Sequence, residues 1–177
     1  MLSREKRCFP FMYRIEICPL KRLYQIDKEL DKSRAAVLAV SSYAIKTELL
    51  SGFVSLLTMQ FADTTVERSA DAFDLQKAKQ IKAFVDALPN QVDTLFVCCD
   101  SGESRSTAMA AAILRYLKLD EWVIWKNSHY HPNPLVYSRL CAAFGIRVWK
   151  YGLRRRVKCS ENAFRNAIKA NERKARR

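Results

Sequence analysis

Two features are missing from this sequence: a long apolar run and a C-x-x-C pair. A membrane-spanning helix needs roughly 18 consecutive apolar residues, and no segment approaches that length. Zinc ribbons and thioredoxin-like proteins are excluded, and six cysteines in 177 residues are too sparse for a disulfide scaffold. Reduced thiols are therefore expected. Hydrophobic residues make up 49% of the chain, which excludes disorder as its main state.

The first residues also lack the pattern of a secretory signal. Arg4, Lys6 and Arg7 precede a short apolar patch that Arg14 and Glu16 interrupt. We therefore expect a cytoplasmic protein that has no contact with membranes.

Acidic residues are scarce only at the C-terminal end. Residues 147–177 carry twelve basic and two acidic side chains, whereas residues 35–146 carry ten and eleven. The chain thus combines a neutral body with a basic tail. Two interpretations of the tail stay open: a solvated helix that aids solubility, or a contact surface for a polyanionic partner.

The order of the expected elements predicts an α/β fold. Apolar runs rich in β-branched and aromatic residues predict strands at 13–17, 35–40, 53–61 and 94–98. Helical spacing and capping residues predict helices at 75–88 after Asp74, at 106–118, from Asn133-Pro134 to Gly145, and from Ser160 to about residue 174. We expect a largely parallel central sheet flanked by helices in residues 1–150, followed by a basic helical tail in 151–177.

One loop in this arrangement is suited to binding an anion. The spacing Cys, five residues, Arg occurs four times, beginning at Cys8, Cys99, Cys141 and Cys159. Only the copy at Cys99 has a buried strand before it, a glycine within it and a strong helix after it. Its loop residues are Asp100, Ser101, Gly102, Glu103 and Ser104. Backbone N–H groups and the helix dipole at such a position attract a phosphate dianion.

The same loop supplies a nucleophile and a phosphate-binding group. Positive potential at the helix start is expected to lower the pKa of Cys99, and the resulting thiolate can attack phosphorus. Arg105 offers a planar fork for two phosphoryl oxygens. Ser106 can donate its hydroxyl to the sulfur and ease its departure. This combination of residues predicts phosphoryl transfer.

The segment CCDSGESRS and the alanine-rich helix after it resemble the phosphate-binding loop of cysteine-dependent protein tyrosine phosphatases, the dual-specificity branch being the nearer match. The resemblance extends over residues 35–146, including FAD at 61–63 and YHPNPLVY at 130–137, a segment similar to one in small prokaryotic members. It implies a phosphatase-like fold, a phosphocysteine intermediate, no metal or other cofactor, and an upstream aspartate as general acid. The family usually has histidine before the nucleophile, where this chain has Cys98.

Asp63, just after the third predicted strand, is the expected general acid. Asp71 and Glu67 on the following loop are the alternatives, whereas Asp74 is assigned to capping a helix. Cys98 is expected to be a core residue rather than a redox partner. His129 and His131 lack a third ligand, so no metal site is predicted.

The sequence therefore predicts a hydrolase that releases phosphate from a phosphorylated substrate, of the protein tyrosine or dual-specificity type. Two alternatives stay open. In the first, the substrate is RNA or a nucleotide, which the basic tail favours. In the second, the domain binds phosphate without catalysis, which the missing histidine favours.

Overall fold

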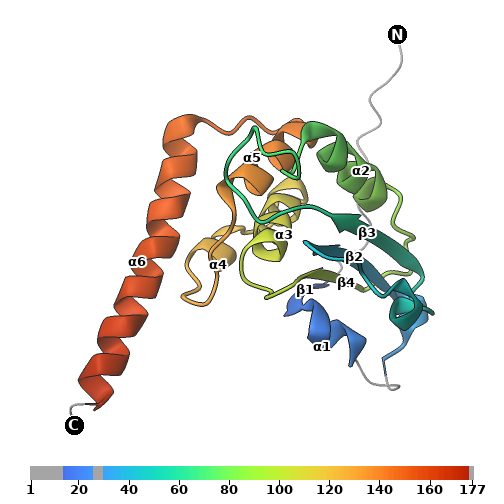
Figure 1. Ribbon diagram of the computed structural model, residues 1–177, viewed down its shortest axis with the longest axis horizontal. Coiled ribbons are helices and arrows are strands. Elements are labelled where there is room, and N and C mark those ends of the chain that lie inside the picture. The colour runs from blue at the N-terminus through green and yellow to red at the C-terminus, as the bar shows by residue number, and fades with distance from the viewer. Residues whose placement is uncertain (1–13, 26–29, 176–177) are drawn as a thin grey trace.

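A computed structural model describes residues 14–25 and 30–175. Four parallel strands form a sheet in the order β1-β4-β2-β3 (Figure 1). They are β1 (Arg14–Pro19), β2 (Ala35–Ser41), β3 (Ser55–Gln60) and β4 (Thr94–Cys99). The predicted α/β fold with a parallel sheet is confirmed. Tyr13, the first residue of the first predicted strand, lies outside the described residues.

The two central strands are apolar along their length because other elements cover both faces of the sheet. Successive side chains of a strand point to opposite faces. Leu95, Val97 and Cys99 of β4 belong to the larger core cluster, whereas Phe96 and Cys98 belong to the smaller one. The neighbouring cysteines therefore face opposite sides of the sheet, and only Cys99 faces the larger core.

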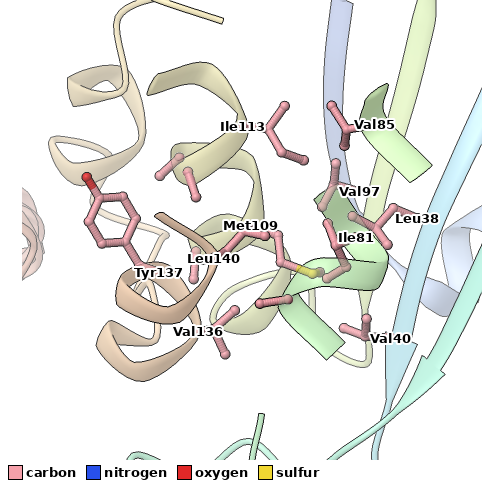
Figure 2. Close-up of a cluster of buried hydrophobic side chains, with 14 of the residues drawn as sticks. Leu38, Val40, Ile81, Val85, Val97, Met109, Ile113, Val136, Tyr137 and Leu140 are labelled. Carbon is pink, nitrogen blue, oxygen red and sulfur yellow. The ribbon is translucent and has the colours of Figure 1, made fainter. Parts of the chain in front are cut away.

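Three helices form the larger core with the sheet: α2 (Leu75–Asp86), α3 (Arg105–Tyr116) and α5 (Pro134–Ala143). Figure 2 shows Ile81 of α2 and Met109 of α3 in this cluster with Val97 of β4. On the opposite face lie α1 (Leu20–Tyr24) and the 3-10 turn η2 (Thr47–Leu50), while a second turn, η1 (Lys32–Arg34), precedes β2.

The predicted caps of α2 and α5 are present. The Lys77 N–H donates to Oδ1 of Asp74 at 2.7 Å, and the side-chain oxygen of Asn133 accepts from two N–H groups in the first turn of α5. Gly145, with φ of +75°, follows the end of α5 in the left-handed conformation that glycine adopts readily. These caps determine where α2 and α5 begin.

The predicted start of the last helix is wrong. This helix, α6 (Lys150–Ala175), begins ten residues before Ser160. Ser160 lies in its interior, where its hydroxyl donates to the Tyr130 carbonyl at 2.7 Å. The helix continues through Gly152 because Leu153 and Val157, one turn apart, pack against the larger core. Tertiary packing thus outweighs the usual cost of about 1 kcal/mol for glycine in a helix.

A buried carboxylate attaches α6 to the body. Glu121, which precedes the short helix α4 (Trp122–Trp125), is 5% exposed and pairs with the Arg156 guanidinium at 2.5 Å. It also accepts hydrogen bonds from the Tyr137 hydroxyl and the Trp125 indole. A buried carboxylate needs such partners because its desolvation alone costs several kcal/mol. The final turns of α6 extend beyond the rest of the molecule (Figure 1).

Within residues 14–25 and 30–175, no helix combines the length and apolar character required to cross a membrane. The same residues contain no group of three or more histidine, cysteine or carboxylate side chains placed to hold a metal ion.

Candidate active site

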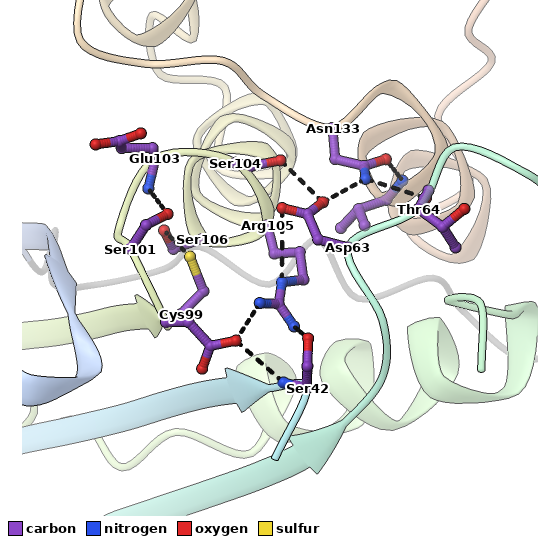
Figure 3. Close-up of polar contacts among 12 residues, drawn as sticks. Ser42, Asp63, Thr64, Cys99, Ser101, Glu103, Ser104, Arg105, Ser106 and Asn133 are labelled. Carbon is purple, nitrogen blue, oxygen red and sulfur yellow. Dashed lines mark hydrogen bonds and ion pairs between the residues drawn. The ribbon is translucent and has the colours of Figure 1, made fainter.

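Cys99 is the last residue of β4 and begins the loop of residues 99–104, here called the Cys99 loop. Its side chain is buried, and its sulfur has two polar neighbours. The Gly102 N–H donates to Sγ at 3.2 Å, and the Ser106 hydroxyl lies 3.1 Å from it (Figure 3). Helix α3 begins immediately afterwards, at Arg105. The sulfur thus lies where N–H groups and the positive end of a helix stabilise a thiolate.

Gly102 is required by the close approach of β1 to this loop. Its φ is +76°, and a Cβ at this position would lie 2.7 Å from the Pro19 nitrogen and 2.9 Å from the Cys18 carbonyl carbon. Both atoms belong to backbone and cannot move aside easily. The Gly102 N–H that contacts the sulfur is therefore positioned by a turn that only glycine fits.

Arg105 ties the loop to the ends of two strands. One terminal nitrogen donates to the Phe61 carbonyl at 2.7 Å and to the Ser42 hydroxyl at 3.1 Å, and the other donates to the Asp100 carboxylate. The side chain is 4% exposed. Its buried Nε has no hydrogen-bond partner among the described residues and lies 3.8 Å from Oδ2 of Asp63. This unused donor can bind an oxygen of an incoming anion.

The expected fork of two free donors is thus only partly available, because Asp100 occupies one side of the guanidinium. Burial opposes ionisation of Asp100. Hydrogen bonds from the Ser41 hydroxyl, the Ser42 N–H and Arg105 outweigh it and lower the pKa of this carboxyl. Asp100 is therefore ionised at neutral pH and holds Arg105 in place.

The remaining loop residues have different surroundings. Ser101 and Glu103 are exposed, and the Glu103 N–H donates to the Ser101 hydroxyl at 3.3 Å. Ser104 instead turns toward the end of β3, where its hydroxyl donates to Oδ1 of Asp63 at 2.9 Å.

Asp63, the expected general acid, reaches the Cys99 loop from the segment after β3. Besides Ser104, it accepts a hydrogen bond from the side-chain amide of Asn133 at 2.7 Å (Figure 3). Asn133 is 3% exposed and also donates to the Thr64 carbonyl. The sequence identified Asn133 only as a helix cap. Its second contact had no sequence signal, because it depends on how α5 packs beside the loop.

The two alternative acids lie further from Arg105. Asp71 lines a cavity of about 300 Å³ with Ser42 and Phe61, both of which contact Arg105. Glu67 faces Arg139 of α5 at 3.8 Å. Asp63 is thus in direct contact with the Cys99 loop. Asp71 lies in the cavity beside Arg105, and Glu67 is directed at Arg139 instead.

Cys98, which stands where histidine is usual, is fully buried as expected of a core residue. It is also paired across the sheet with Cys18 of β1, and the two sulfurs lie 3.2 Å apart. The hydrogen bond with Cys18 and burial together raise the pKa of Cys98 well above the usual value of a thiol. Cys98 therefore remains protonated at neutral pH.

The two histidines lie in the segment between α4 and α5. The His131 N–H donates to the Glu103 carbonyl at 2.9 Å, and its ring packs edge-on against Phe164 of α6 at 4.9 Å between centroids. The His129 N–H donates to the Asn127 side chain. His131 thus connects the Cys99 loop to α6.

The sequence matches no family model and no curated protein. The crystal structure of PTPMT1 in complex with PI(5)P is similar to this chain, with a TM-score of 0.50, 17% identity, and coverage of 74% of this chain and 90% of that one. A further PTPMT1 structure has 19% identity over 88% and 94% of the two chains, with a TM-score of 0.36. The Yvh1 phosphatase domain from Chaetomium thermophilum has 19% identity over 70% and 75%, with a TM-score of 0.34.

At 17% identity, the first of these likenesses establishes a shared fold. It confirms the phosphatase-like fold expected from the resemblance in sequence.

Proposed function

We propose that this chain is a cysteine-dependent phosphatase, which hydrolyses a phosphate monoester through a phosphocysteine intermediate. One observation carries the proposal: the Cys99 sulfur lies between the Gly102 N–H and the Ser106 hydroxyl, at the start of a helix that begins with a buried arginine. A nucleophile and an anion-binding group are thereby combined in one loop.

In the first step, the Cys99 thiolate attacks phosphorus, and the bond from phosphorus to the leaving oxygen breaks. The Nε of Arg105, which has no hydrogen-bond partner among the described residues, stabilises the charge on the phosphoryl oxygens. Asp63 donates a proton to the leaving oxygen, which departs as an alcohol or phenol.

In the second step, water attacks the phosphocysteine. Asp63, now ionised, accepts a proton from this water, and the bond from sulfur to phosphorus breaks to release inorganic phosphate. The Ser106 hydroxyl, 3.1 Å from Sγ, donates to the departing thiolate. The step restores both Cys99 and Asp63 to their starting forms.

The fold shared with PTPMT1 supports this proposal, because that fold brings the carboxyl end of a strand and the start of a helix together at the loop. PTPMT1 is seen in complex with PI(5)P, so a phosphoinositide belongs among the substrates to be tested.

Phosphate release from a panel of substrates tests the function. The panel contains an aryl phosphate, phosphotyrosine and phosphoserine peptides, a phosphoinositide and 5′-triphosphorylated RNA. Hydrolysis of the aryl phosphate and at least one other substrate is expected. Binding of vanadate without hydrolysis of any substrate would instead identify a silent phosphate-binding module.

A further inference from the structure

The first half of α6 borders a groove whose rim is strongly basic. A cavity of about 470 Å³ lies between α6 and the start of α5. Pro134, Leu153 and Val157 are its apolar lining. Four cations and one acid, all on α6, also line it: Lys150, Arg154, Lys158, Arg165 and Glu161, the last two forming an ion pair at 3.7 Å. The cations recur at spacings of four, four and seven residues, so they follow one face of the helix for about 22 Å. Such a row complements a chain of regularly spaced negative charges.

This groove adjoins the Cys99 loop. Pro134 lines the groove, and Asn133, the residue before it, bonds to Asp63. The Asn133 N–H also donates to the Ser104 carbonyl at 3.3 Å. In Figure 1, α6 lies on the side of the sheet toward which the carboxyl ends of β2, β3 and β4 point. The start of α5 therefore connects the groove to Asp63 and to the Cys99 loop.

Exposed aromatic side chains lie at the start of the basic row. Trp149 and Tyr151, on either side of Lys150, are 63% and 80% exposed. The Arg147 guanidinium stacks over the Trp149 ring at 3.8 Å. Proteins that bind single-stranded nucleic acid combine aromatic rings with a basic groove, because bases stack on the rings while cations contact the phosphates.

A membrane surface fits these features less well. An interfacial helix exposes a continuous apolar stripe to the lipid. On α6 most of that stripe is covered: Leu153 and Val157 pack on the core, and Phe164 lies against the His131 ring. Of this stripe only Phe164 and Ile168, one turn apart, are 42% and 41% exposed, so its exposed apolar surface is a single turn long. An acidic peptide would use the cations but not the aromatic rings.

We propose that the groove along α6 binds single-stranded RNA, with backbone phosphates on the four cations and bases on Trp149 and Tyr151. The proposal rests on the proposed function in one respect: the phosphate monoester at the 5′ end of the strand is the substrate of the Cys99 loop. It extends that function by assigning a substrate class and the surface that selects it.

Binding of a 5′-phosphorylated RNA of about twelve nucleotides tests this. The full chain carries Cys99→Ser so that the probe is not consumed, and fluorescence anisotropy is measured over a range of salt concentrations. Adding Arg154→Gln and Lys158→Gln should weaken binding at least tenfold at low salt. It should also reduce the slope of log affinity against log salt by about 1.4, since each phosphate contact contributes about 0.7 for a single strand.

The matched control is Arg173→Gln with Lys174→Gln, which removes the same charge from the far end of the helix, outside the groove. It should leave the affinity within about twofold. Trp149→Ala should weaken RNA binding about tenfold without changing the salt slope, because it removes stacking and no charge. It should leave the binding of inorganic polyphosphate, which has no bases, unchanged.

Equal losses in the two double variants would overturn the proposal, since the effect would then be one of net charge. The proposal would also be overturned if the protein bound anionic vesicles or acidic peptides but did not bind RNA. Failure of the proposed function looks different: the wild-type protein would then not hydrolyse even an aryl phosphate. If the enzyme is active but the groove substitutions leave its affinity for RNA unchanged, only the assignment of RNA as the ligand is refuted.

Discussion

The side-chain amide of Asn133 donates a hydrogen bond to Oδ1 of Asp63 at 2.7 Å, across 70 positions of sequence. The other oxygen of Asp63, Oδ2, then faces Nε of Arg105. The carbonyl oxygen of the same amide caps α5. Asn133 therefore acts as a positioning residue for the proposed general acid and links its orientation to the start of a core helix.

Asn133→Asp separates these two roles. The carboxylate still caps α5, but it cannot donate to Asp63 and places a like charge beside it. We expect turnover of a substrate with a poor leaving group to fall about tenfold, and that of an activated aryl phosphate to fall less. The pH profile of turnover should also change, because the substitution places a second carboxyl group beside Asp63. An unchanged profile would remove Asn133 from the mechanism.

Asp63→Asn tests the general acid itself. Loss of proton donation should lower turnover of poor leaving groups by about 10² to 10⁴-fold, and should affect an activated aryl phosphate much less. Asp71→Asn, at the edge of the site, should not show this dependence on the leaving group. The reverse pattern would assign the acid to Asp71.

Gly102→Ala should disrupt the Cys99 loop, because the added Cβ would lie 2.7 Å from a backbone nitrogen of β1. We expect at least about a tenfold loss of turnover and a lower melting temperature. Gly145→Ala is the matched control: Gly145 has a similar φ of +75°, but a Cβ there meets nothing within 4 Å. If the two variants lose turnover equally, the contact with β1 has no role in the site.

Asp74→Ala should show a pH-dependent loss of stability. The hydrogen bond from the Lys77 side chain, followed by that from its backbone N–H, lowers the pKa of Asp74 below 3.8. A lowered pKa in the folded state stabilises the protein at neutral pH, and this contribution disappears as the pH falls below 3.8 through the folded-state value. The substitution should lower the free energy of unfolding, measured with urea, by about 1 kcal/mol at neutral pH and by progressively less in acid. A loss independent of pH would mean that the carboxylate charge is not involved.

The parts of this molecule that sequence could predict are local. Cys99, Gly102 and Ser106 lie within eight residues, and the strand before them and helix after them restrict how the loop can fold. The cap residues Asp74 and Asn133 are equally local signals. Such features depend on neighbours in the chain and not on the packing of distant elements.

The parts that could not be predicted depend on which elements become neighbours in space. Cys18 meets Cys98 only because β1 pairs with β4, and Asn133 meets Asp63 only because α5 packs beside the loop. Ser160 has a strong preference for helix starts, yet the contacts of Arg156 with Glu121 extend the helix well before it. In each case a tertiary contact decides the role of the residue.

The central claim is that the Cys99 thiolate is the nucleophile, and turnover of an aryl phosphate by Cys99→Ser tests it most directly. Cys141→Ser is the control, because burial raises the pKa of Cys141 to about 11 and so keeps it protonated at neutral pH. We predict that Cys99→Ser abolishes turnover but still binds vanadate, while Cys141→Ser remains active. Turnover by Cys99→Ser within about tenfold of the wild-type rate would contradict the mechanism.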